Sequence, residues 1–344
     1  MPEPIGVGLV GYGLAGRWFH ARLIGAEPRL ALRAVVTSRL DELRQDQPAV
    51  RAAPDLDALL GDAGIDLVVV ATPNHLHFDQ ARRALEAARH VVVDKPMTLS
   101  LAEAEALAAL AERQGRVLAV FHNRRWDADF LTLRRLLAEG TVGRPVLLES
   151  RVDRYRPQLL GRWREQAGPG SGVFIDWAPH LIDQVVQLFG RPDWVQADIR
   201  AARAGAVSDD EFLLLMGYPQ LRVALRSGSL VAAPTPRFSL FGEAGAWIKH
   251  GLDPQEAALR AGHTPGGAGW GVDPEPGRLW LGGAAELVDG PAERGDYTRF
   301  YAGLAAAIAG EGPNPVPTAE AVGVMGLIEL AAESARLGRR LSPA

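Results

Sequence analysis

Short apolar runs alternate with longer segments of helical apolar spacing over the first 122 residues. Five runs rich in valine, leucine and isoleucine stand at residues 5–10, 32–37, 66–72, 90–95 and 116–122. Runs of this length are typical of buried strands, and helical segments between successive strands are typical of a parallel sheet. The pattern therefore predicts a doubly wound α/β domain over residues 1–122.

A second pattern begins near residue 144, where strand-like runs follow one another mostly without intervening helices. These runs lie at residues 145–155, 194–202, 211–218, 221–230 and 237–250. Strands in direct succession favour antiparallel pairing, so residues 123–344 are predicted to form an α+β domain with a largely antiparallel sheet. Within it, residues 264–277 are rich in glycine and proline and predict a loop. Residues 296–309 and 318–337 predict helices that could pack back on the first domain.

Two helices carry recognisable end signals. Ser100 and Glu103 have the spacing of a capping box, in which the glutamate reaches back to the cap, and Gly115 would close that helix. Asp127 stands where a second helix would begin, and Gly140 stands where it would stop. We therefore expect helices after Ser100 and after Asp127.

Composition narrows the range of partners. The chain has 344 residues, of which 47% are hydrophobic and 23% are charged, and this length predicts two domains. The formal net charge is -4 and the basic residues are scattered, so we expect no surface that binds nucleic acid. The lack of cysteine excludes disulfides, thiolate metal sites and thiol nucleophiles. No basic segment precedes the first apolar residues, and no apolar run reaches membrane-spanning length. We expect a cytoplasmic protein whose ligands are small molecules.

A glycine-rich turn follows the first predicted strand. Gly11, Gly13 and Gly16 have the G-x-G-x-x-G spacing, with Tyr12, Leu14 and Ala15 between them. Such spacing gives a tight turn, a bare backbone where a pyrophosphate approaches, and close packing of helix on strand. A glycine turn without a ligand is the alternative, but the strand before it and the helix after it favour a dinucleotide site.

The choice of cofactor is expected at the end of the second strand, where an acidic residue would bind the adenosine ribose of NAD. That position reads Thr37, Ser38 and Arg39, which offer hydroxyl donors and a guanidinium suited to a 2'-phosphate. NADP is therefore favoured, with NAD possible. In the alternative interpretation Arg39 is a solvated helix residue and Asp41 binds the ribose.

Residues 172–190 form an apolar helical segment interrupted by Asp176, His180 and Asp183. Their spacing places them on one face of a helix, which is either a solvated stripe or a site. Pro179 lacks an N–H and fits a helix best near its first turn, so Asp176 is expected close to the cap.

Several motifs together resemble the Gfo/Idh/MocA family, which includes glucose-fructose oxidoreductase and inositol dehydrogenases. They are the glycine fingerprint, "ATPNHLHFDQA" and "VVVDKPMTLS". The stretches "RRWDADF", "DRYRP" and "DWAPHLIDQVVQLFG" look like the NADP-dependent scyllo-inositol dehydrogenase subgroup. The resemblance spans essentially the whole chain. It implies a Rossmann domain followed by an open-faced sheet domain, with the nicotinamide between them against the fourth and fifth strand ends.

The resemblance also implies catalytic residues. The family's E-K-P motif falls on Asp94, Lys95 and Pro96, and its D-x-x-x-H motif falls on Asp176 and His180. A lysine beside the nicotinamide can hydrogen-bond the substrate hydroxyl, while a histidine can take the proton and the aspartate can orient the pair. Asp94 is one methylene shorter than the family's usual glutamate, which puts its contacts in question.

Further site residues follow from position and resemblance. Cofactor contacts are expected after the fourth, fifth and sixth strands, from Thr72, Pro73, Asn74, His77, Asp94, Lys95, Pro96, Asn123, Arg125 and Trp126. Substrate contacts are expected from Arg154, Tyr155, Arg156 and Trp163, because sugars need directional donors and an aromatic face. His75 and His77 have no paired carboxylate or cysteine nearby, so no metal site is predicted.

The predicted reaction is hydride transfer between NADP(H) and a hydroxyl of a cyclitol or sugar. Two alternatives remain: a regulator that binds the cofactor without turning it over, and NAD-assisted glycoside hydrolysis on the same fold. The strands at 211–218 and 221–230 carry apolar residues on more than one face, with too few helices to cover both. We therefore expect a homo-oligomer formed through the open sheet face.

Overall fold

The computed structural model describes residues 3–282, 287–289 and 292–343. The chain divides into two compact units, and neither is one continuous segment. Unit 1 comprises Met1–Asn123, Gln255–Trp270 and Asp296–Met325, and unit 2 comprises Arg124–Pro254, Gly271–Gly295 and Gly326–Ala344.

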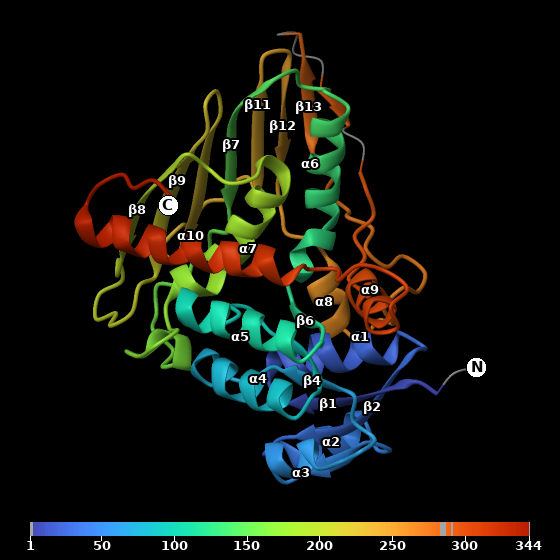
Figure 1. The fold of residues 1–344 in the computed structure, drawn as a ribbon. Helices are drawn as coiled ribbons and strands as arrows, with labels where there is room; N and C mark the ends of the chain where they lie inside the picture. The colour runs from blue at the N-terminus through green and yellow to red at the C-terminus, as the bar shows by residue number, and fades with distance from the viewer. Residues whose placement is uncertain (1–2, 283–286, 290–291, 344) are drawn as a thin grey trace. The chain divides into compact units, whose positions relative to one another are not determined.

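Unit 1 is built on a six-stranded parallel sheet of order β3-β2-β1-β4-β5-β6 (Figure 1). The strands are β1 (Ile5–Val10), β2 (Leu30–Val36), β3 (Arg51–Ala53), β4 (Leu67–Val70), β5 (His90–Val93) and β6 (Leu118–Val120). This order is that of a Rossmann sheet, as the alternating pattern predicts. β3 has no counterpart among the predicted runs, because three residues of an edge strand with an arginine and two alanines leave no apolar signal.

The helices of unit 1 are mostly short. They are η1 (Gly16–His20), α1 (Ala21–Gly25), α2 (Leu40–Asp46), α3 (Leu56–Leu60), η2 (Asn74–Leu76), α4 (His77–Glu86), α5 (Leu101–Arg113), α8 (Gln255–Arg260), α9 (Thr298–Ile308) and the start of α10 (Thr318–Leu337). The late segments complete the core of this unit. Phe300 packs edge-on against Phe121 with ring centroids 4.9 Å apart, and the side chains of Asn314 and Thr318 donate to the carbonyl of Leu118.

The predicted helices after Ser100 and Asp127 are confirmed, but their capping contacts differ from those expected. Ser100 accepts the N–H of Glu103 at 3.2 Å, but the Glu103 carboxylate accepts the N–H of Leu99 instead of that of the cap itself. Asp127 is the N-cap position of α6 (Ala128–Ala138), yet its side chain does not cap the helix. Its carboxylate accepts from Arg124 at 3.1 Å.

Unit 2 contains an eight-stranded sheet of order β14-β13-β12-β11-β7-β10-β9-β8 (Figure 1). The strands are β7 (Pro145–Arg151), β8 (Trp194–Arg200), β9 (Glu211–Gly217), β10 (Arg222–Gly228), β11 (Phe238–Gly242), β12 (Gly245–Lys249), β13 (Arg278–Leu281) and β14 (Leu287–Asp289). Every pair is antiparallel except β7 with β10, so the largely antiparallel sheet is confirmed. β13 and β14 were not predicted, since both are short and lie beside glycine-rich sequence.

The helices α6 and α7 (Val173–Phe189) lie on one side of this sheet (Figure 1), and η3 (Asn123–Trp126) and η4 (Trp163–Glu165) stand in the connections. Most strand residues that point to the opposite side are exposed or half-buried, and they include charged side chains, such as Glu149, Arg151 and Arg226, as well as apolar ones. The apolar ones include Leu147, Leu213, Leu215, Ala224 and Ile248, which the strand register brings onto one face. We call these five residues the open face.

Candidate functional site

The three fingerprint glycines of unit 1 are required for different reasons. A Cβ on Gly11, whose φ is +98°, would lie 2.4 Å from the carbonyl oxygen of Ala71, and one on Gly16 would lie 2.0 Å from the carbonyl oxygen of Gly11. These two glycines permit close backbone packing. A Cβ on Gly13 would meet no described atom within 4 Å. Gly13 therefore leaves an open approach to the backbone, which fits a bound pyrophosphate.

A polar cluster that the sequence did not reveal supports this turn. Tyr12 is buried and its hydroxyl donates to Asp46 at 3.3 Å, while Arg17 donates to the same carboxylate at 2.6 and 3.0 Å. Burial, and next the charge of Asp46, raises the pKa of Tyr12 to about 12. The Tyr12 ring thus points into the protein, whereas Leu14 is 50% exposed and Ala15 is half-buried.

The side chain of Arg39, which follows β2, makes weak contacts. Thr37 accepts the backbone N–H of Arg39 at 2.9 Å, and Ser38 is exposed. The Arg39 guanidinium lies 3.4 Å from Glu42, and both side chains are largely exposed. An exposed pair of this kind contributes about 0 to 1 kcal/mol, so a phosphate could displace it at little cost. Asp41 is also exposed and pairs with Arg44 at 3.4 Å.

The segments that follow β4 and β5 are joined by His77. Its ring is fully buried, with Nδ1 2.8 Å from the carbonyl oxygen of Pro96 and Nε2 2.9 Å from that of Thr72. Burial lowers the pKa of His77, and the charge of Asp94 opposes that shift. The neutral ring carries a single N–H, so His77 donates to one of these two carbonyl oxygens while its other ring nitrogen faces the second. Nearby, Pro73 is exposed, Asn74 is buried, and Thr72 donates its hydroxyl to Gln80 at 2.7 Å.

The side chain of Asp94, which directly follows β5, forms a hydrogen bond with the backbone of the next residue. Its Oδ1 accepts the backbone N–H of Lys95 at 2.8 Å, and both residues are half-buried. The Asp94 charge also reaches His20, a fully buried residue of η1 whose Nδ1 lies 2.6 Å from the hydroxyl of Tyr301. Burial lowers the pKa of His20 to about 4. The only sequence signal for His20 was its place on the helix that follows the glycine turn.

In unit 2, α7 begins earlier than Pro179 suggested. Gly172 is the N-cap, with φ +95°, and Asp209 Oδ1 accepts the N–H of Phe174 at 2.6 Å. Burial raises the pKa of Asp209 to about 6. Pro179 consequently lies inside the helix, and Asp176 lies in its first turn instead of at the cap. An interior proline lacks one backbone bond and crowds the preceding turn, so α7 keeps Pro179 at a cost to its own stability.

The polar residues of α7 have separate surroundings. Asp183 is buried and binds the Arg125 guanidinium at 2.5 and 2.9 Å. Asp176 is partly exposed, and its Oδ1 lies 3.3 Å from Arg164 Nε. His180 is 6% exposed, and its ring centroid lies 5.9 Å from that of Trp177. Asp183 thus belongs to a buried ion pair with Arg125, a residue predicted to contact the cofactor.

The predicted substrate residues share the connection between β7 and α7. The Arg154 guanidinium lies 5.0 Å from the ring centre of Trp177 on α7. Tyr155 and Trp163 are 61% and 38% exposed, and Arg156 is also exposed. These side chains therefore meet solvent in unit 2. Of the two remaining predicted residues, Asn123 is buried in unit 1 and Trp126 is half-buried in unit 2.

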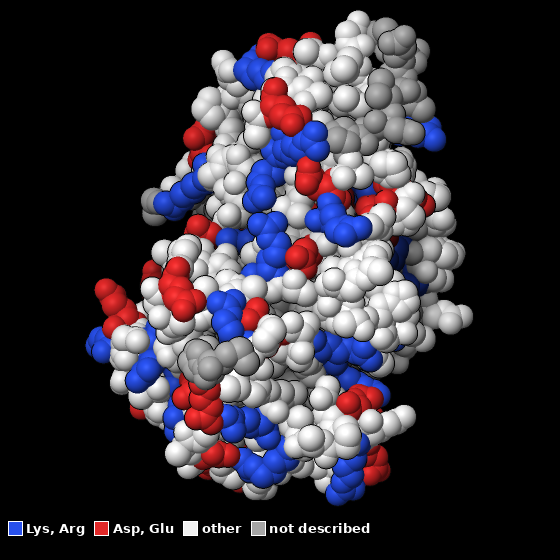
Figure 2. Space-filling model, turned by 90° about the vertical axis from the view of Figure 1, so that its right-hand side faces the viewer, with Lys and Arg blue, Asp and Glu red and all other residues white. Residues whose placement is uncertain are grey.

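Other kinds of site find little support in the residues with assigned positions. Within that part of the chain, no group of three or more histidines, aspartates and glutamates could hold a metal ion. No helix of the described ranges has the length and apolarity needed to cross a membrane. Figure 2 shows basic and acidic side chains intermixed on the face in view, without a broad area of one sign.

Comparison with protein families yields two matches that together cover most of the chain. Residues 5–122 match the model described as "Oxidoreductase family, NAD-binding Rossmann fold". Residues 134–342 match the model described as "Oxidoreductase family, C-terminal alpha/beta domain".

Individual relatives are similar over nearly their full length. The oxidoreductase YdgJ of Escherichia coli (strain K12) is 46% identical over 98% of both chains. The scyllo-inositol 2-dehydrogenase (NADP(+)) IolW of Bacillus subtilis (strain 168) is 37% identical over 98% of this chain and 96% of its own. Among solved structures, the oxidoreductase YPO2259 of Yersinia pestis is 46% identical, with a TM-score of 0.94 over 99% of this chain and 98% of its own.

Proposed function

The chain belongs to the Gfo/Idh/MocA family of oxidoreductases, and from that premise we propose that it transfers a hydride between NADP(H) and a cyclitol or related sugar. The observation that carries this proposal is the full-length similarity to IolW, whose name states an NADP-dependent scyllo-inositol dehydrogenase. Lys95, Asp176 and His180 stand at the positions of the family's catalytic motifs in this sequence.

The cofactor would be held by residues of unit 1. The Gly11–Gly16 turn would bind the pyrophosphate through its backbone, because Gly13 leaves that backbone open. Thr37, Ser38 and Arg39 would bind the 2'-phosphate that distinguishes NADP from NAD. When bound, the nicotinamide supplies the carbon that accepts the hydride from the substrate. His77 would act indirectly, through its packing between the segments that follow β4 and β5 and through its one N–H, which donates to the carbonyl oxygen of Thr72 or of Pro96.

Polar and charged side chains would transfer the proton of the substrate hydroxyl. Lys95 Nζ would donate a hydrogen bond to the reacting hydroxyl oxygen and stabilise negative charge that develops there. The His180 ring would accept the hydroxyl proton, and the Asp176 carboxylate would hold the ring in position. In the reverse direction the same proton would return to the carbonyl oxygen. Arg154, Tyr155, Arg156 and Trp163 would contact the polyol.

We also propose a homo-oligomer in which the open face of one copy meets that of another. The open face places leucine and isoleucine side chains at exposed or half-buried positions across neighbouring strands. Contact of this face with the same face of a second copy would give a two-fold dimer.

The test is a screen of cyclitols and aldoses with NADP+ and with NAD+, followed by absorbance of the reduced nicotinamide. We expect oxidation of at least one cyclitol, faster with NADP+ than with NAD+. Cofactor binding without turnover on any polyol would favour the regulator. Release of a leaving group without net cofactor reduction would favour glycoside hydrolysis.

A further inference from the structure

The connection from β7 to α7, residues 154–171, carries an unusual amount of exposed apolar surface. Tyr155, Leu159, Leu160 and Trp163 are 61%, 38%, 59% and 38% exposed. We call this segment the 154–171 loop. Its near end is anchored by backbone, because Tyr155 forms a β-bridge with Leu230 and the N–H of Arg156 donates to the carbonyl oxygen of Ser229 at 2.7 Å. Beyond that bridge the loop is mostly irregular, with η4 as a short regular element. A loop that presents such side chains in a fixed arrangement must be held by contacts outside itself.

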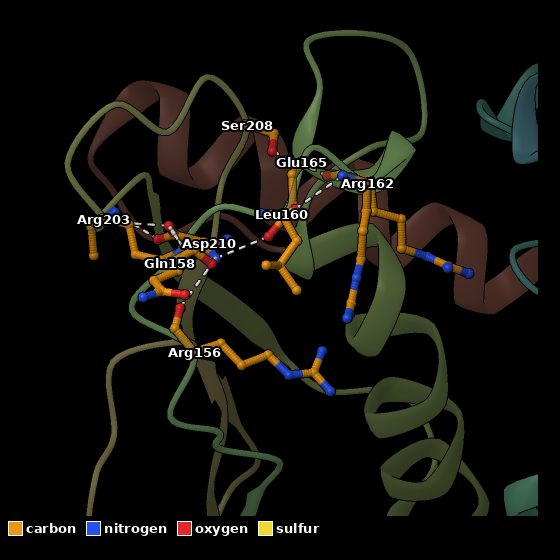
Figure 3. Close-up of polar contacts among 10 residues, drawn as sticks. Arg156, Gln158, Leu160, Arg162, Glu165, Arg203, Ser208 and Asp210 are labelled. Atoms are coloured by element: carbon orange, nitrogen blue, oxygen red, sulfur yellow. Dashed lines mark hydrogen bonds and ion pairs between the residues drawn. The ribbon is translucent and has the colours of Figure 1, made fainter.

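Arg203 supplies several of these contacts from the connection between β8 and β9. Its side chain is 5% exposed, and its Nη1 lies 3.2 Å from the carbonyl oxygen of Arg156, 3.1 Å from that of Gln158 and 3.0 Å from Glu165 Oε1 (Figure 3). Its Nε donates to Asp210 at 2.8 Å. One guanidinium therefore joins both limbs of the loop to the start of β9.

Glu165 extends this contact into the loop. While its Oε1 faces Arg203, its Oε2 accepts the backbone N–H groups of Leu160 at 2.9 Å and Arg162 at 3.1 Å (Figure 3). The carboxylate thus closes the turn at residues 160–165. Trp163 lies inside that turn, so its position depends on the pair formed by Arg203 and Glu165.

The far limb of the loop reaches α7. The carbonyl oxygen of Arg164 accepts the N–H of Gly172 at 2.9 Å and the hydroxyl of Ser208 at 3.1 Å. The Arg164 side chain lies 4.4 Å from the ring centre of Trp163 and 3.3 Å from Asp176. The residue next to Trp163 therefore pairs with the carboxylate that precedes His180 by one helical turn.

We propose that Arg203 is a positioning residue that sets polyol recognition through the 154–171 loop. By tying residues 156–165 to the start of β9, it presents Trp163, together with Tyr155 and Arg156 on the bridged near end, as a preformed surface of aromatic faces and cationic donors. It also keeps Arg164 beside Asp176. Preformed contacts avoid the entropy cost of ordering side chains when the ligand binds. This inference rests on the proposed function, because it takes the polyol as the ligand of the loop.

The test compares Arg203→Met with wild type and with Arg200→Met. Arg200 lies three residues earlier, is 62% exposed, and pairs only with Glu211 among the contacts described, so it is a control that leaves the loop in place. We expect Arg203→Met to raise KM for the polyol about tenfold to a hundredfold, because several side chains must then be ordered on binding. The dissociation constant for NADPH should change less than about twofold, since that ligand makes no use of the loop.

Two further variants guard against a simple folding defect. Glu165→Gln leaves the pair of Arg203 with Asp210 intact and should raise KM in the same direction, by a smaller factor. Arg203→Lys keeps the charge but cannot reach all four acceptors, so KM should lie between those of wild type and Arg203→Met.

Hydrogen exchange supplies a measurement that does not depend on turnover. The amides of Leu160, Arg162 and Gly172 should exchange faster in Arg203→Met than in wild type or Arg200→Met. An unchanged exchange rate would overturn the inference, as would faster exchange with an unchanged KM. If wild type turns over no polyol, the proposed function fails on its own, and the exchange rates still show whether Arg203 holds the loop.

Discussion

At the scale of single residues, proton transfer and cofactor binding should be separable by mutation. Lys95→Met removes the ammonium while keeping much of the side-chain volume, and His180→Ala removes the proposed base. General acid-base catalysis contributes a factor of about 10² to 10⁴ in rate. The turnover number of His180→Ala should therefore decrease by a factor in this range, and that of Lys95→Met should decrease by at least as large a factor. NADP affinity, measured by titration, should stay close to wild type in both.

Gly13→Ala serves as the control, because it should weaken cofactor binding instead of proton transfer. Its Cβ enters open space in the protein, so the fold should persist, but the methyl group occupies the proposed approach of the pyrophosphate. Cofactor affinity should therefore fall. If Lys95→Met and His180→Ala kept near wild-type turnover, the roles given to both residues would be wrong.

Cofactor selectivity is a second prediction at this scale. A charge-assisted hydrogen bond contributes about 1.5 to 3 kcal/mol, so Arg39→Ala should weaken NADP roughly tenfold to a hundredfold while leaving NAD unchanged. Arg44→Ala is a matched control, because Arg44 is likewise exposed and paired within the same helix. Calorimetric titration with both nucleotides measures the difference. A wild-type protein that binds NAD as tightly as NADP would contradict the assignment.

Residues whose roles depend on local backbone could be predicted from sequence, and residues paired across the fold could not. The glycine spacing specifies a turn by itself, because each glycine answers a backbone requirement within a few residues. Asp183 gave no sign that it would bind Arg125, which lies 58 positions away. Arg203 was likewise absent from the expected site residues, since its partners belong to another connection.

At the scale of elements, the packing of η1 against α9 makes a pH-dependent contribution to stability. His20 is fully buried beside Tyr301, with Asp94 and His77 acting on it electrostatically, and its pKa is lowered to about 4. A lowered pKa means that the neutral ring stabilises the fold above pH 6.5, and that this stabilisation is lost as the pH falls through about 4. The shift corresponds to about 3 kcal/mol of unfolding free energy.

His20→Asn should therefore flatten the pH dependence of unfolding between pH 7 and pH 4 by an amount of about this size. The asparagine keeps a polar partner for Tyr301 but does not titrate in this range. Urea unfolding at a series of pH values gives the slope directly. His263→Asn, at an exposed histidine, should keep the wild-type slope. Equal slopes for wild type and His20→Asn would exclude this contribution.

Long apolar elements were predictable, whereas short ones were not. The runs that became β1, β4 and β5 are continuous valine-rich stretches, and burial on both faces explains that composition. β3 and α8 contain few residues and no apolar period, so neither left a pattern in the sequence. The start of α7 was placed too late because Pro179 was taken as a first-turn residue, whereas the helix begins at Val173 and carries this proline in its interior.

At the scale of the whole molecule, the open face should bind a second copy of the chain. We expect light scattering at micromolar concentration to show a dimer or larger assembly. Leu213→Lys places a charge on the open face at a side chain that is 41% exposed, so it should shift the protein toward monomer without unfolding it. Leu252→Lys changes a leucine of similar exposure, 40%, outside the open face and should leave the assembly intact. A monomeric wild type would remove the proposal.

Unit 1 takes its residues from three separate stretches of the chain, and this imposes an order on its folding during synthesis. The first 123 residues emerge from the ribosome long before Asp296–Met325, which carry Phe300 and the Tyr301 partner of His20. At about 5–20 residues per second, the nascent sheet waits roughly 10–40 s for these side chains. During that interval Phe121 lacks Phe300 and Tyr301, so we expect the growing chain to expose apolar surface that the finished protein buries.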